Sequence, residues 1–175
     1  AQAEHDVNAQ SILITDDKNL IHLVNLSLKK QLIKLRKKNI ASQSLKNFGL
    51  AILANSKKNI LDAINTIAPE HLELCTNIDN EIIKGVKNAG SIFIGKFSPE
   101  AIGDYIAGPN HVLPTSGSAR FSSGLSVNDF LKRHSLIKIT KTGIERLGPS
   151  VINLAEHENL DGHANSVKIR LKKEK

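Results

Sequence analysis

Short apolar segments rich in β-branched residues alternate with segments of helical periodicity through the first half of this 175-residue chain. We expect strands at residues 11–15, 49–54, 72–76 and 91–94. Between them, apolar residues recur at helical spacing over residues 20–35, 60–67 and 78–87. Strands that alternate with helices are typical of a parallel sheet with helices on its faces. The sequence therefore predicts an α/β fold with a layered parallel-type sheet and flanking helices.

The character of the sequence changes after Thr115, where residues 116–124 are polar and rich in Ser and Gly. The elements expected beyond this stretch are a short helix over residues 126–131, a strand over 136–140, a helix over 143–158 interrupted near Pro149, and a segment over 163–171 that fits either helix or strand. The prediction is a partial Rossmann-like α/β domain over residues 1–118 and a small α+β or helical domain over residues 119–175.

Composition excludes several classes of protein. The single cysteine, Cys75, rules out an internal disulfide and a Cys-based zinc knuckle, and its apolar, extended surroundings predict a buried thiol. No apolar run approaches the ~18 residues that a membrane span needs, and no export signal is present. We expect a cytoplasmic protein with no membrane partner. Because it lacks methionine and opens without a helix cap, we also expect a fragment of a longer polypeptide.

The net charge of +7 leaves a basic nucleic-acid-binding module open as an alternative. The lysines concentrate in two places, at Lys29, Lys30, Lys34, Lys37 and Lys38 and at Lys172 and Lys173. Such runs are typical of a solvated helix face or tail. Aromatic residues that could stack on bases amount to one tyrosine and five phenylalanines. We therefore expect no nucleic-acid partner.

Residues 68–115 collect Gly, Pro, His, Asp and Glu on three neighbouring turns, within A-P-E-H-L-E-L, A-G-S-I-F-I-G and G-D-Y-I-A-G-P-N-H-V-L-P-T. Loops of this composition between apolar segments are where a scaffold displays catalytic groups. In parallel sheets the ligand binds beyond the carboxyl ends of the strands. Glu70, His71 and the loop after Ile94 could converge there.

Glu70 and His71 are the strongest candidates on the residues alone. Neighbouring residues point about 100° apart on a helix and to opposite faces on a strand, so an acid and an imidazole in one small site require an irregular turn. Pro69 favours such a turn. The alternative is a solvent-exposed pair at the start of a strand.

The other candidates are weaker one by one. Gln2 and His5 lie three residues apart, so on a helix both could hold one ion, although such pairs are usually ordinary surface. Asp104 suits a hard cation or caps a helix or turn. His111 and His163 lie in expected loops, and His111 could equally brace its loop.

Five motifs in order along the whole chain resemble the histidinol dehydrogenase family. They are Q-A-E-H at residues 2–5, P-E-H-L at 69–72, A-G-S-I-F-I-G at 89–95, G-D-Y-x-A-G-P-N-H-V-L-P-T at 103–115 and A-E-x-E-x-L-x-x-H at 155–163. The resemblance implies NAD-dependent oxidation of L-histidinol through L-histidinaldehyde to L-histidine, the last step of histidine biosynthesis.

The resemblance also assigns roles to residues. It implies a Zn²⁺ site made by Gln2, His5, Asp104 and His163, and a catalytic pair in which His71 is the base and Glu70 activates water. The substrate contacts that it implies are Gln2, His5, His71, Asp104, His111, Glu158 and His163. The presence of Glu70, His71 and all four candidate zinc ligands argues against the alternative of an inactive relative with the same fold.

The resemblance further implies a homodimer in which the C-terminal segment, with Glu158 and His163, completes the partner's site. The family's NAD contacts lie upstream of Gln2, and the chain has no G-x-G-x-x-G phosphate loop, so no residue here is expected to bind NAD. We expect the isolated chain to be inactive. Asn159 departs from the family's usual glycine, which puts the local turn in doubt.

Overall fold

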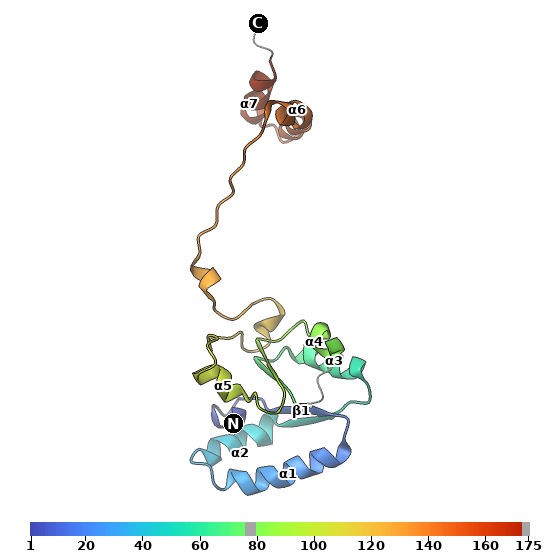
Figure 1. Cartoon of the computed structure of the whole chain (residues 1–175), viewed down its shortest axis with the longest axis vertical. Coiled ribbons are helices and arrows are strands. Elements are labelled where there is room, and N and C mark those ends of the chain that lie inside the picture. The colour runs from blue at the N-terminus through green and yellow to red at the C-terminus, as the bar shows by residue number, and fades with distance from the viewer. Residues whose placement is uncertain (76–79, 173–175) are drawn as a thin grey trace. The chain divides into compact units, whose positions relative to one another are not determined.

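The computed structural model describes residues 1–75 and 80–172, and the chain separates into two compact units, Ala1–Phe130 and Leu131–Lys175 (Figure 1). The first unit contains η1 (Gln2–Glu4), β1 (Ile12–Thr15), α1 (Lys18–Leu32), α2 (Lys38–Phe48), β2 (Leu50–Leu53), α3 (Lys57–Ile67), β3 (His71–Leu74), α4 (Asn80–Gly85), β4 (Ser91–Ile94), α5 (Glu100–Tyr105), η2 (Ser118–Arg120) and η3 (Val127–Phe130). The second contains α6 (Lys141–His157) and α7 (Asp161–Leu171). A boundary at residue 118 and exchange of the second domain stay predictions.

The strands form two parallel pairs, β1 with β2 and β3 with β4, which confirms the α/β class with parallel strands. The expected strands divide between two small sheets. Parallel strands are usually covered on both faces. Here Leu50 and Leu53 of β2 are 53% and 45% exposed, so in this chain one sheet lacks part of its cover.

The helix expected over residues 20–35 is α1, and a second helix that the sequence pattern did not predict, α2, follows it at Lys38–Phe48. Asp17 caps α1 by accepting a hydrogen bond from the Asn19 amide (2.8 Å), and α1 ends at Leu32. Helix α2 packs against η1 and lies beside α1 (Figure 1). The Ser44 hydroxyl, fully buried on α2, donates to the Ala9 carbonyl (2.7 Å). This helix therefore supports the N-terminal segment that carries Gln2.

The next helix and strands follow the prediction closely. The Ser56 hydroxyl caps α3, which buries Ile64, and the helix ends at Ala68 in the left-handed conformation (φ 51°). Strand β4 has the expected bounds. Residues 76–79, where the expected third strand ends and the next helix begins, lie outside the described residues.

The strand expected over residues 136–140 is wrong. These residues pair with no strand in the described part of the chain, and Leu136 is 94% exposed. A β-branched segment becomes a strand only where a neighbouring strand takes up its backbone hydrogen bonds. The expected interruption at Pro149 is also absent. Helix α6 continues through Pro149 and packs along α7.

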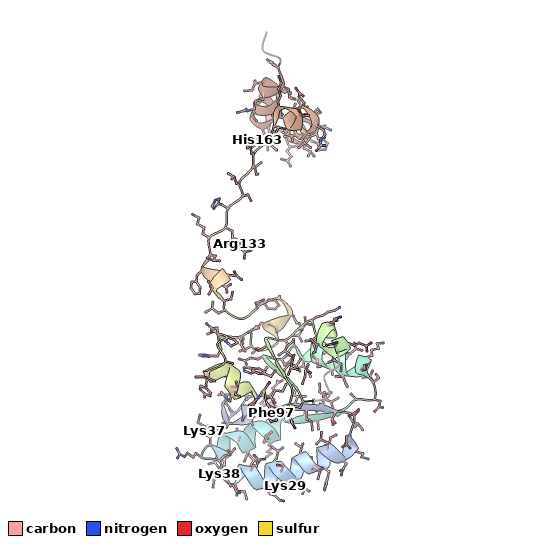
Figure 2. All side chains as sticks on the ribbon, viewed as in Figure 1. Lys29, Lys37, Lys38, Phe97, Arg133 and His163 are labelled. Atoms are coloured by element: carbon pink, nitrogen blue, oxygen red, sulfur yellow. The ribbon has the colours of Figure 1, made fainter. Side chains whose placement is uncertain are left out.

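Figure 2 shows Lys29, Lys37 and Lys38 around the end of α1 and the start of α2. All three side chains are exposed, as expected for a solvated face. Within the described residues, no helix combines the length and apolar character needed to cross a membrane.

Candidate active site

A cavity of about 400 Å³ in the first unit brings together residues from four separate segments of the chain. Six of the eight residues predicted for the site line it: Gln2, His5, Glu70, His71, Asp104 and His111. Asp6, Asn8 and Ala9 complete the lining. The fold therefore collects acid, amide and imidazole groups that lie up to 109 positions apart, as the residue numbers of Gln2 and His111 give.

The short helix η1 presents Gln2 and His5 to the cavity. The His5 amide donates to the Gln2 carbonyl (3.3 Å), which closes one turn and places the two residues near each other. Ala3 between them is buried against the rest of the unit, where α2 packs on η1. The predicted Gln-x-x-His pair thus sits on a single anchored turn.

Glu70 and His71 lie on the irregular turn that the sequence predicts. Glu70 is in a bend after Ala68, and His71 is the first residue of β3. The Ser91 amide donates to the Glu70 carbonyl (2.9 Å), which fixes this bend to β4. A Cβ atom on Gly90 would lie 2.6 Å from that carbonyl oxygen, so the close approach requires glycine.

Asp104 lies in the last turn of α5, a helix that the sequence analysis did not anticipate. Its Gly, Tyr and Pro neighbours suggested a turn. The helix starts where the Glu73 carboxylate accepts a hydrogen bond from the Glu100 amide (2.7 Å). Tertiary contact therefore supports a helix that its local sequence specifies weakly.

The imidazole of His71 faces two carboxylates on α5. Its Nε2 atom lies 3.5 Å from Asp104 Oδ1 and 3.9 Å from Glu100 Oε1, and it is buried without a hydrogen-bond partner. Glu100 is the residue of this cluster that the sequence analysis missed. Its spacing of four from Asp104 was the available signal, since residues i and i+4 share a helix face.

Glu100 has a raised pKa relative to its ordinary value of 4.5. Burial is the main cause, because it disfavours the charged carboxylate. A hydrogen bond with Asp104 and the negative charge of Asp104 raise this pKa further, whereas His71 and His5 lower it. Acids and imidazoles therefore interact closely at and beside the cavity.

The second unit carries the other two predicted residues, Glu158 and His163. Glu158 caps the end of α6 and is exposed. His163 is in the first turn of α7 and is also exposed (Figure 2). Asn159 between them has φ 58°, a left-handed conformation that glycine adopts freely and asparagine tolerates. The departure from the usual glycine is therefore compatible with this turn.

Cys75, expected to be buried, is an exposed free thiol. It follows Leu74, the last residue of β3, so the strand ends before its side chain can be enclosed. Cys75 is not among the residues that line the cavity.

A sequence model of histidinol dehydrogenase matches residues 1–171. The chain belongs to the histidinol dehydrogenase family. It is 51% identical over 170 residues to the histidinol dehydrogenase of Caldanaerobacter subterraneus subsp. tengcongensis, and 52% identical over 172 residues to that of Pelagibacter ubique. These alignments cover 97% and 98% of this chain and 40% of each relative.

The fold agrees with a solved histidinol dehydrogenase. The crystal structure of the enzyme from Elizabethkingia anophelis superposes with a TM-score of 0.91 at 40% sequence identity, covering 97% of this chain and 39% of that one. The chain thus spans about 40% of the length of the histidinol dehydrogenases it matches.

Proposed function

We propose that this chain is the C-terminal portion of a histidinol dehydrogenase that oxidises L-histidinol to L-histidine in two NAD-dependent steps. The observation that carries the proposal is the cavity in which Glu70 and His71 meet Gln2, His5 and Asp104. An acid and an imidazole beside candidate metal ligands form a constellation suited to alcohol and aldehyde oxidation.

The cavity suits a zinc ion by the chemistry of its donors. Gln2 supplies an amide oxygen, His5 an imidazole nitrogen and Asp104 a carboxylate, all lining one cavity. We assign these three residues and His163 to zinc. When bound, the metal would hold the imidazole and amine of the substrate. A different group of possible ligand atoms, on His71, Glu100 and Asp104, lies within 4.8 Å, so Asp104 belongs to both groupings.

His71 is the proposed base of the first oxidation. Oxidation of the alcohol removes a hydride from carbon and a proton from the hydroxyl group. NAD, when bound, accepts the hydride. An imidazole can accept the proton of the hydroxyl group at neutral pH. His71 lines the cavity and is largely buried, with 13% of its side chain exposed.

Glu70 is the proposed base of the second oxidation. The aldehyde must first add water to its carbonyl carbon, and a carboxylate beside the cavity can take the proton that this water loses. Loss of a second hydride from the hydrate then produces the carboxylic acid. His71, the next residue in the chain, relays the proton of the hydrate hydroxyl.

NAD and a second protomer complete the proposed enzyme. We assign the NAD contacts to sequence outside this chain, because the chain contains no G-x-G-x-x-G loop. We further propose a homodimer in which Glu158 and His163 of one protomer complete the site of the other. His111 and Glu158 are proposed to contact L-histidinol. The isolated chain is expected to be inactive.

The test follows NADH formation by the full-length protein with L-histidinol and, separately, with L-histidinaldehyde. We expect turnover of both, and we expect Glu70→Gln to slow the aldehyde reaction more than the alcohol reaction. Glu145→Gln, an exposed glutamate on α6, is the matched control. A folded, zinc-loaded protein that oxidises neither compound would refute the proposed activity, and equal losses with both substrates would refute the role of Glu70.

A further inference from the structure

None of the roles proposed above uses Glu100, although its side chain is as buried as that of His71, with 13% exposed in each case. Burying a carboxyl group is costly unless it has polar partners. The polar groups beside it are Asp104, one helical turn away, and Nε2 of His71 at 3.9 Å, an atom that has no hydrogen-bond partner. The position of this acid therefore calls for an explanation at the site itself.

Glu100 is held in place from the strand that carries His71. The Glu73 carboxylate accepts a hydrogen bond from the Glu100 backbone amide at 2.7 Å. His71 and Glu73 are alternate residues of β3, so their side chains leave the same face. One strand thus supplies both the imidazole and the anchor for the first turn of α5.

The other end of α5 is fixed by close packing. A Cβ atom on Gly103 would lie 2.5 Å from Cε1 of Phe93, so the helix backbone rests directly on that ring. Phe93 is the register partner of Glu73 on β4. Its ring centroid also lies 6.0 Å from that of His71. The imidazole is therefore enclosed between the Phe93 ring and the acids of α5.

We propose that Glu100 is a positioning residue that holds the imidazole of His71 in the orientation needed for proton transfer. This inference rests on the proposed function, in which His71 is the base. Two carboxylates lie near Nε2: Asp104 at 3.5 Å, which is assigned above to zinc, and Glu100 at 3.9 Å, which is not. A carboxylate free to accept from Nε2 favours the tautomer that carries its proton on that nitrogen and restrains rotation of the ring. The 3.9 Å separation is of the kind that tightens when substrate closes a site.

The test compares Glu100→Leu, which keeps much of the volume but no polar atom, with Glu100→Gln, which keeps the hydrogen-bonding geometry. In the full-length, zinc-loaded protein we expect Glu100→Leu to lower the single-turnover rate of NADH formation from L-histidinol about 10- to 100-fold. KM and zinc content should stay within about twofold, and Glu100→Gln should recover most of the rate. Asp62→Asn, an exposed acid on α3, is the control.

A spectroscopic measurement tests the same point without turnover. The imidazole ¹⁵N shifts of His71 should report one dominant tautomer in the wild type and in Glu100→Gln, and a mixture in Glu100→Leu. This reading separates the two proposals: an inactive wild type refutes the enzyme assignment, whereas identical tautomers in all three proteins overturn the role of Glu100 alone.

Three further outcomes would overturn the positioning role. They are a rate for Glu100→Leu within twofold of the wild type, loss of zinc from that variant, and equal impairment of Glu100→Gln. If Glu100→Leu does not fold, Glu100→Ala replaces it, because this change also removes the carboxyl group near Nε2 of His71. An unchanged His71 tautomer in Glu100→Ala would then overturn the proposal, and a mixed tautomer would support it.

Discussion

The two units of this chain place the residues predicted for the site in opposite ways. In the first unit the lining comes from η1, the turn before β3, α5 and the loop at His111, so only tertiary structure brings it together. In the second unit, Glu158 and His163 flank a single turn between α6 and α7. Local sequence suffices to place the second set, whereas the first set depends on packing.

The units also differ in how they bury apolar surface. The first unit encloses Ile64, Leu72 and several alanines. In the second, the buried residues are the small Gly148, Ala155 and Ala164, and large side chains remain exposed. On α6 and α7 these are Leu147, Val151, Leu154 and Ile169, with 46%, 45%, 67% and 60% exposure. Two helices cannot enclose a core alone.

The largest expected effect is the loss of turnover in a variant of His71, and it is compared with the effect on KM of a variant of Glu158 in the second unit. His71→Asn should lower NADH formation by the full-length protein by about 10²- to 10⁴-fold, the usual contribution of a general base, while zinc stays bound. Glu158→Gln should raise KM with a smaller change in kcat. His22→Asn, an exposed histidine on α1, is the control. Near-normal turnover by His71→Asn would refute the role of His71 as the general base.

Zinc binding tests whether both units contribute ligands. His5→Asn and His163→Asn should each weaken zinc binding more than about 10-fold, because even residues that only support a ligand contribute that much. Metal analysis after dialysis measures this effect in the full-length protein. The exposed His134→Asn variant should keep full occupancy. Full zinc in His163→Asn would restrict the metal site to the first unit.

Substitution of one buried and one exposed apolar residue tests the difference in burial between the two units. Ile64→Ala, at a residue 2% exposed, should lower the free energy of unfolding by about 2–5 kcal/mol. Leu154→Ala, at 67% exposure, should change the free energy of unfolding of this chain by about 0.5 kcal/mol or less. Denaturant titration measures both. A larger cost for Leu154→Ala that grows with protein concentration would show that another copy covers this face.

The smallest effect concerns the pH dependence of the first unit. Because burial and Asp104 raise the pKa of Glu100 in the folded state, the folded protein binds its proton more tightly than the unfolded chain does. The resulting stabilisation is present below pH 4.5 and is lost as the pH rises through the raised pKa. In the metal-free Glu100→Gln variant, this pH-dependent decrease in the free energy of unfolding should be absent. The same pH dependence of the free energy of unfolding in the wild type and in Glu100→Gln, measured from pH 4 to pH 8, would contradict this prediction.

Much of the fold could be predicted because its signals are local. Strand β4, the Ser56 cap and the parallel pairing follow from β-branched runs, a hydroxyl before a helix, and alternation of elements. The expected strand over residues 136–140 failed because strand formation depends on a partner that local sequence cannot supply. Helix α5 was missed for the converse reason, since Glu73 and Phe93 stabilise it from other elements.

The sequence by itself determined the family and the α/β class, because these follow from residue types in a fixed order, and it supplied the candidate site residues. Only the tertiary structure decided that Gln2, Glu70, Asp104 and His111 share one cavity, and that Glu100 belongs beside His71. Convergence of side chains depends on how helices pack on strands. That packing arises from contacts between residues far apart in the chain, which no single segment encodes.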